Sequence, residues 1–140
     1  MRDNKWLANL LHTLHLQYFS DVEIPNLLLV RFTRCGRTRF GSILARPRKG
    51  HSVPVTTISI NELFRDEAVP EFVITATLLH EFVHYAHGFH SPHPQKYLYP
   101  HRGGIVNKEI RARGAGEILH QQNQWIKHSY KPFLKSKNLL

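Results

Sequence analysis

Residues 70–88 read PEFVITATLLHEFVHYAHG, and the position of one long helix follows from this stretch. Pro70 suits the first turn of a helix, where its missing N–H group costs no hydrogen bond, and Gly88 suits the residue that ends one. We therefore predict a helix from about Glu71 to about His87. The apolar residues that recur with the spacing of a helix packed on one face are Phe72, Ala76, Leu79, Val83 and Ala86.

The residues before this helix predict one further helix and a small sheet. Apolar side chains in residues 3–17 follow the 3.6-residue period of a helix packed on one side. Three short segments rich in apolar or β-branched residues follow, at 27–32, 38–45 and 54–60. Because the connections between these segments are short, we expect an antiparallel sheet of about three strands.

The residues after the helix predict more helical structure. A helical region is expected from Val106 to about Tyr130 and Pro132, with an interruption near Gly114 and Gly116. An N-terminal helix, a short sheet and C-terminal helices together indicate the α+β class.

The composition indicates one globular domain over residues 1–140. Hydrophobic residues make up 41% of the chain and aromatic residues 11%, which argues against disorder despite a formal net charge of +9. No apolar run approaches roughly 18 residues, so we expect no membrane partner and no signal peptide. Cys35 is the only cysteine, which excludes an internal disulfide and a cysteine-rich zinc ribbon. We expect a cytoplasmic protein.

Basic residues gather in two parts of the chain. One is the segment 31–49, which contains no acidic residue, and the other lies in a predicted basic helical extension, residues 117–140. Such runs either contact a polyanion such as DNA or form solvated faces, and charge alone does not separate these readings. On the first reading, Arg46, Arg48 and Lys49 are the expected nucleic-acid contacts.

The predicted helix carries the motif HExxH at residues 80–84. His80 and His84 are four residues apart, so both imidazoles project from one face of the helix and can meet a single ion. Glu81 lies about 100° further round the helix, where it can reach a water bound to that ion. Neutral imidazoles suit Zn²⁺, and a catalytic zinc site needs three protein ligands and an open position for water. A chance match is the alternative, since the chain has 11 histidines.

Three residues compete to be the third ligand. His90 has the spacing of the metzincin motif HExxHxxGxxH, but that motif has glycine where this chain has His87. It also needs a methionine downstream, and the only methionine here is Met1. Glu109 would complete a site of two histidines and one glutamate. His101, in YPHRGGI, stands just before the last helical region.

The order of these motifs resembles the SprT-like zinc metallopeptidase domain, over roughly residues 10–116. The chain departs from the family's pattern at Arg102, where a glycine is usual, in a long histidine-rich loop, and in having no zinc ribbon afterwards. These departures concern the subfamily and the substrate rather than the metal. The matching residues are Tyr18 and Phe19, Arg39 to Ser42, Ile58 to Ile60 with Leu63, Pro70, His80 to His84, His101, Ile105 and Gly114.

The resemblance implies a small zincin-like domain in which His80, His84 and His101 hold one Zn²⁺. The 16 residues between His84 and His101 are enough for the chain to turn back over the motif helix. Zinc held by three imidazoles lowers the pKa of its water toward about 7 and polarises a peptide carbonyl, while Glu81 accepts the water's proton.

The expected activity is therefore zinc-dependent hydrolysis of peptide bonds in a protein or peptide substrate. In eukaryotic members of the resembled family the substrate is protein crosslinked to DNA, so proteins associated with nucleic acid are an expected substrate class. The alternative is a non-catalytic nucleic-acid-binding module with a structural zinc site.

The loop after the motif helix carries three further histidines and two tyrosines. His87, His90 and His93 are spaced by three, and we expect a solvated or substrate-facing loop, with an accessory metal site as the alternative. Tyr97 and Tyr99 either stabilise an oxyanion or pack the loop.

Overall fold

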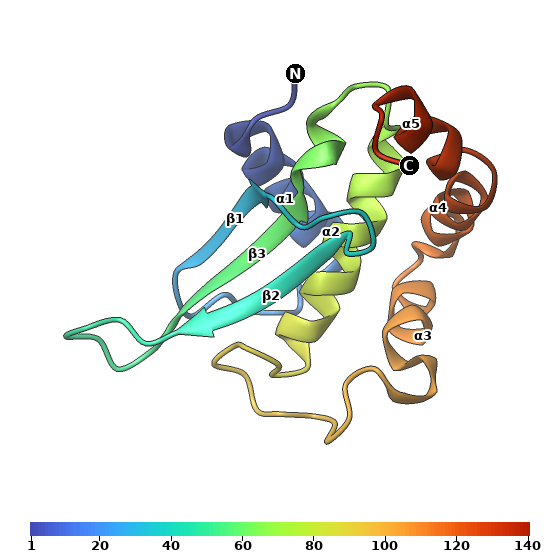
Figure 1. Cartoon of the computed structure of the whole chain (residues 1–140). Helices are drawn as coiled ribbons and strands as arrows, with labels where there is room; N and C mark the ends of the chain where they lie inside the picture. Colours follow the sequence, from blue (N-terminus) through green and yellow to red (C-terminus); the bar gives the residue numbers. More distant parts are fainter.

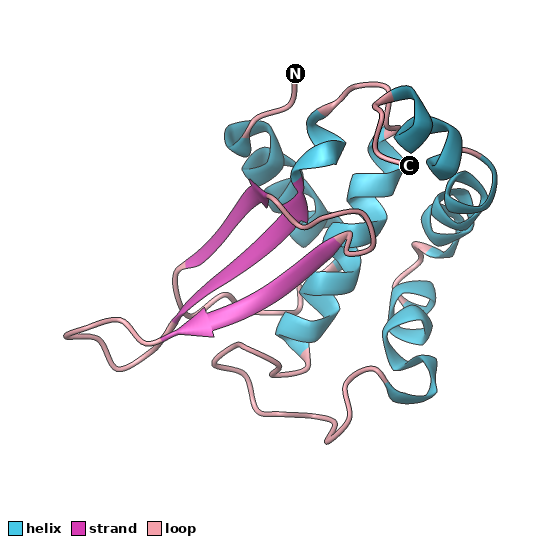
Figure 2. Cartoon of the chain, viewed as in Figure 1, coloured by secondary structure: helices cyan, strands magenta, loops and turns pink.

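The computed structural model describes all residues, 1–140, and confirms the α+β class (Figures 1 and 2). Short 3₁₀ turns at Glu62–Arg65 and Arg102–Gly104 precede α2 and α3. The elements in chain order are α1 (Asn4–Tyr18), β1 (Leu28–Thr33), β2 (Gly41–Arg46), β3 (Val55–Asn61), α2 (Glu71–Ala86), α3 (Ile105–Ala112), α4 (Gly116–His128) and α5 (Tyr130–Ser136).

The three strands form a mixed sheet in the order β1-β3-β2. Strands β2 and β3 are antiparallel, with Gly41 opposite Ile60, whereas β1 and β3 are parallel, with Leu28 opposite Thr56. The prediction of an antiparallel sheet is therefore wrong for β1. The short connection after β1 does reverse the chain, so β2 runs opposite to β1. Strand β3 then enters between them, and because it is antiparallel to β2 it must be parallel to β1.

Helix α2 lies at the centre of the fold, between the sheet and the C-terminal helices (Figure 1). Of its 16 residues, 12 are buried, including Thr77, Glu81 and His84. The predicted division into one packed and one open face is therefore too simple, because α3 and α4 cover the side opposite the sheet. The predicted ends are confirmed: the helix begins directly after Pro70, and Gly88 follows its end with φ +79°.

Helix α1 covers the β1 side of the sheet. Asp3 caps its first turn, because its side chain accepts a hydrogen bond of 2.8 Å from the backbone N–H of Trp6. Leu7, Leu11 and Leu14 are buried along one face, as the sequence period predicts.

The C-terminal helices belong to the same core as the sheet. The predicted interruption is confirmed at Gly114, where a φ of +88° ends α3 before α4 begins. Leu119, Trp125 and Phe133 are buried in the common hydrophobic cluster. Residues 117–140 therefore do not form a separate arm, although their lysines are exposed. No helix of the chain has the length and apolar character needed to cross a membrane.

Candidate metal centre

Helix α2 brings the imidazoles of His80 and His84 together. Their Nε2 atoms lie 3.2 Å apart, as expected for residues separated by one helical turn. Two nitrogens bound to one tetrahedral Zn²⁺ at about 2.0–2.1 Å would be separated by about 3.3 Å. The pair thus has the spacing that a shared zinc ion requires.

His101 completes a three-histidine cluster that could hold a metal ion. One ligand nitrogen from each of His80, His84 and His101 lies within 4.8 Å of the other two. The His101 ring centroid is 4.5 Å from that of His84 and 6.4 Å from that of His80. His84 is buried and His80 half-buried, whereas His101 is exposed, so the cluster is open to solvent on the His101 side.

The connection between α2 and α3 can return to the motif helix because it turns sharply at Gly88. A Cβ atom there would clash with the carbonyl oxygens of His93 and Pro94, so only glycine fits. The Ser91 hydroxyl donates a hydrogen bond of 2.6 Å to the Tyr85 carbonyl, which holds the connection against the end of α2.

The two histidines of α2 have lowered pKa values, which suits neutral metal ligands. Burial, together with the nearby imidazole of His101, lowers the pKa of His80 to about 4. Burial and the neighbouring histidines lower the pKa of His84 to about 3. Both imidazoles are therefore neutral at pH 7, with a nitrogen lone pair available. The Nδ1 atom of His84 is buried without a hydrogen-bond partner, so no protein group accepts a hydrogen bond from this second ring nitrogen to fix the orientation of the ring.

Glu81 lies beside the cluster rather than within it. Its side chain is 6% exposed and lines a cleft of about 420 Å³ together with His80, Arg39 and Gln122. Burial raises the pKa of Glu81 to about 7, although the positive charge of Arg39 acts in the opposite direction. A carboxyl group with a pKa near 7 can accept and return a proton at neutral pH.

Gly41 allows β2 to start close against α2 at this cleft. A Cβ atom at this position would lie 2.7 Å from Thr77 Cγ2 and 3.4 Å from Glu81 Cγ. A larger residue would therefore push the strand away from the helix face that carries Glu81. This contact gives a physical reason for the glycine in the segment 39–42.

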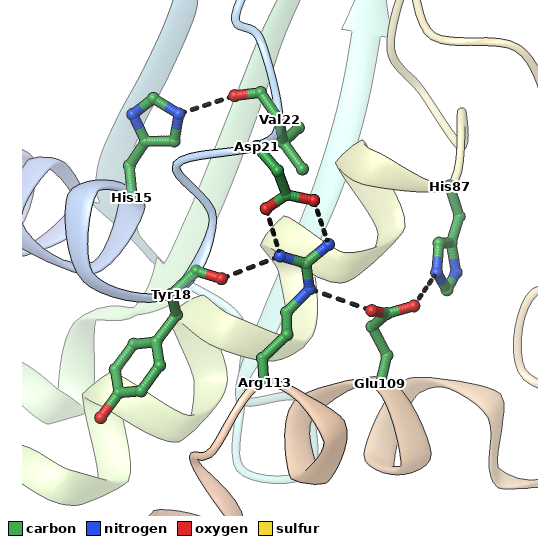
Figure 3. A network of polar contacts seen from close by, with 7 residues as sticks. All are labelled: His15, Tyr18, Asp21, Val22, His87, Glu109 and Arg113. Carbon is green, nitrogen blue, oxygen red and sulfur yellow. Dashed lines mark hydrogen bonds and ion pairs between the residues drawn. The ribbon is translucent and has the colours of Figure 1, made fainter.

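The other two candidates for the third ligand, His90 and Glu109, make contacts outside the histidine cluster. His90 has a left-handed backbone, with φ +53°, and its Nδ1 accepts a hydrogen bond of 3.1 Å from the N–H of Ala45. Both carboxylate oxygens of Glu109 are engaged, one by His87 Nε2 at 3.0 Å and the other by Arg113 Nε at 3.0 Å (Figure 3). The structure brings neither residue into the histidine cluster.

The prediction of a solvated or substrate-facing loop is wrong for His87, which is 4% exposed and contacts Glu109. His93 Nε2 donates a hydrogen bond of 2.7 Å to the Glu23 carbonyl, and no second metal-binding cluster forms from these histidines. Tyr97 packs against the His87 ring, with ring centroids 5.0 Å apart, whereas Tyr99 is exposed.

Arg46, Arg48 and Lys49 are exposed, at the end of β2 and in the loop that follows. This loop extends beyond the sheet (Figure 1). The side chains are therefore accessible to a large partner.

Two residues of the cleft, Gln122 and Arg39, have no predicted role in the site. Gln122 Nε2 donates hydrogen bonds of 3.0 Å to the Val73 carbonyl and to Thr77 Oγ1, which joins α4 to the motif helix. No local pattern could have revealed Gln122, because its partners lie 45 and 49 residues away. The position of Arg39 beside Phe40 and Gly41 in the sequence was an indication that it lies at the cleft.

Comparisons with models of known protein families, with characterised proteins and with solved structures find no match to this chain. The function is therefore inferred from the fold and the site.

Proposed function

We propose that the chain is a zinc-dependent metallopeptidase of the SprT-like type, with His80, His84 and His101 as the metal ligands. The observation that carries this proposal is the buried Glu81 in a cleft beside a solvent-open cluster of three histidines. Three imidazoles with an open side match a catalytic zinc site, whereas structural zinc sites are usually closed by four protein ligands.

Bound Zn²⁺ would supply a water of lowered pKa and would polarise the substrate carbonyl. Glu81 would accept a proton from the attacking water on its carboxylate and return it to the departing amine. The burial that raises the pKa of Glu81 supports its role in both proton transfers.

The outer edge of β2 beside the cleft supports an extended peptide as the substrate, although further along it the N–H of Ala45 donates to His90. Asn61 N donates to the Phe40 carbonyl, so Phe40 and Asn61 form a hydrogen-bonded pair, and such pairs alternate along an antiparallel ladder. The N–H groups of Gly41 and Ile43 therefore point away from β3, along the edge beside the cleft. An extended peptide can pair with such an edge through its own backbone.

The test is hydrolysis of casein by the zinc-loaded protein and by Glu81→Gln. The amide cannot accept a proton but leaves the three histidines in place, so we expect zinc to be retained and hydrolysis to fall by at least about a hundredfold. Casein hydrolysis at close to the normal rate by the zinc-loaded variant would exclude Glu81 as the base.

The exposed residues Arg46, Arg48 and Lys49 support a contact with DNA that brings proteins associated with nucleic acid to the site. The second candidate function is a non-catalytic nucleic-acid-binding module with structural zinc, and the same exposed residues favour it. The open histidine cluster and the adjacent Glu81 favour the peptidase.

A further inference from the structure

A second hollow adjoins the cleft that contains Glu81. It has a volume of about 570 Å³, within the range of roughly 300–1,000 Å³ typical of ligand pockets. Thr38 and Phe40 line both this hollow and the cleft, so the two are neighbours. The hollow is lined by Arg37, Thr38, Phe40, Ile126, Tyr130, Leu134 and Leu140, and we call it the Phe40 pocket.

The lining of the Phe40 pocket is mostly apolar, and contacts between aromatic rings fix the position of Phe40. The Phe40 ring meets the rings of Phe64 and Tyr130 edge-on, at centroid distances of 4.8 and 5.0 Å. The Tyr130 hydroxyl donates a hydrogen bond to the Arg37 carbonyl. Ile126, a lining residue on α4, is 39% exposed. The pocket thus presents an apolar surface that nothing in the chain fully covers.

The Leu139 backbone shows one contact that the pocket offers to a peptide. Its carbonyl accepts a hydrogen bond of 2.8 Å from Arg37 Nη1, and the neighbouring Leu140, which is 60% exposed, is one of the lining residues. An aliphatic side chain on the wall and a backbone carbonyl on the guanidinium are contacts that any extended peptide with an apolar residue can make.

We propose that the Phe40 pocket binds a bulky apolar side chain of the peptide substrate, close to the bond that is cleaved. This inference rests on the proposed peptidase function, because the cleft beside the pocket is the one that contains Glu81. Its substrate class is a peptide with an aromatic or large aliphatic residue near the scissile bond. Ile126 and Phe40 then determine specificity, and Arg37 positions the substrate backbone.

Binding to the pocket can be measured without zinc and without activity. The probe is N-acetyl-phenylalanine amide, with N-acetyl-alanine amide as its small counterpart, titrated into the full chain with labelled Ile and Leu methyl groups. We expect saturable shifts of the Ile126 and Leu134 methyl signals with the phenylalanine probe and much smaller shifts with the alanine probe. Absence of shifts, or equal shifts with both probes, would overturn the pocket assignment.

Cleavage of a fluorogenic peptide library gives the second test. We expect kcat/KM to be at least about tenfold higher for peptides with phenylalanine or leucine at one position near the cleaved bond than with alanine there. Ile126→Glu, which places a charge on the wall, should reduce this preference to less than about threefold while zinc content is unchanged. Lys127→Ala, at the exposed neighbouring position on α4, should keep the preference.

The outcomes separate the two proposals. Cleavage by the unaltered protein without preference at any position would overturn the role of the Phe40 pocket but would support the proposed peptidase function. Absence of cleavage of every peptide, together with methyl shifts by the phenylalanine probe, would overturn the peptidase and leave the pocket as an apolar peptide-binding site. An unchanged preference in Ile126→Glu would contradict the assignment of Ile126.

Discussion

The Nε2 atom of His87 lies 3.0 Å from Oε1 of Glu109, and this contact joins the end of α2 to α3 (Figure 3). Arg113 Nε donates to the other oxygen of Glu109 at 3.0 Å, and its Nη1 and Nη2 atoms donate to the carboxylate of Asp21. The Arg113 Nη1 atom also donates to the Tyr18 carbonyl at 2.8 Å. These bonds tie α3, which follows the turn that carries His101, to α2 and to the end of α1.

Glu109→Gln should destabilise the fold by about 1–2 kcal/mol at pH 7 without loss of zinc. Burial acts to raise the pKa of Glu109, but its hydrogen bond with His87 and the charge and hydrogen bond of Arg113 outweigh burial and lower it. A lowered folded-state pKa gives stability that is present above the unfolded value of about 4.3 and is lost as pH falls through the folded value. Urea unfolding at pH 7 and at progressively lower pH should show the difference from the unaltered protein shrinking. A difference independent of pH, or an equal effect of Glu117→Gln on the exposed face of α4, would contradict this role.

Gly41→Ala should destabilise the protein by about 1–3 kcal/mol and lower its activity. The added Cβ would lie 2.7 Å from Thr77 Cγ2 and 3.1 Å from the Ser59 carbonyl, so β2 or the Thr77 side chain must move beside Glu81. Gly116→Ala is the matched control, because its Cβ would meet Arg111 Cγ at an ordinary 3.4 Å in a helical position. Thermal unfolding of both variants measures the difference in stability, and Gly41→Ala should unfold at the lower temperature. Equal stability of the two would mean that the close packing at Gly41 is not needed.

Reversal of Arg46, Arg48 and Lys49 to glutamate should weaken binding to DNA, and binding by the unaltered protein should weaken steeply as salt rises. Each neutralised phosphate releases a counterion, so the salt slope should shrink by up to roughly three in the triple variant. Fluorescence anisotropy with single- and double-stranded probes measures both quantities. Binding that does not depend on salt, or no binding to any probe, would leave these residues as solvated charges.

Much of the fold follows from local sequence patterns, but strand order does not. The apolar period, Pro70 and Gly88 define α2 because each acts within a few residues of itself. The direction of β1 relative to β3 depends on which strand enters the sheet between its neighbours. That choice is made by packing between distant segments, and the short connections around β2 do not encode it.

In the site, too, local spacing predicts some features, whereas others depend on distant parts of the chain. The spacing of His80 and His84 determines their geometry because a helix fixes it. His101 and Glu109 were both within reach of the loop after α2, and the resemblance to a known family was the ground for preferring His101. The bond between His87 and Glu109 spans 22 residues, so spacing could not have predicted that this carboxylate is engaged elsewhere. By contrast, the four-residue spacing of Glu109 and Arg113 on one helix was a usable signal.

We propose that His80, His84 and His101 hold one zinc ion, and elemental analysis of ligand variants is the decisive measurement. After expression and purification with zinc present, the unaltered protein, His90→Ala and Glu109→Gln should each carry about one equivalent, and His101→Ala should carry much less. Circular dichroism of every variant checks that it is folded. Zinc retained by folded His101→Ala and lost from folded Glu109→Gln would contradict this ligand assignment, as would an unaltered protein that contains no transition metal.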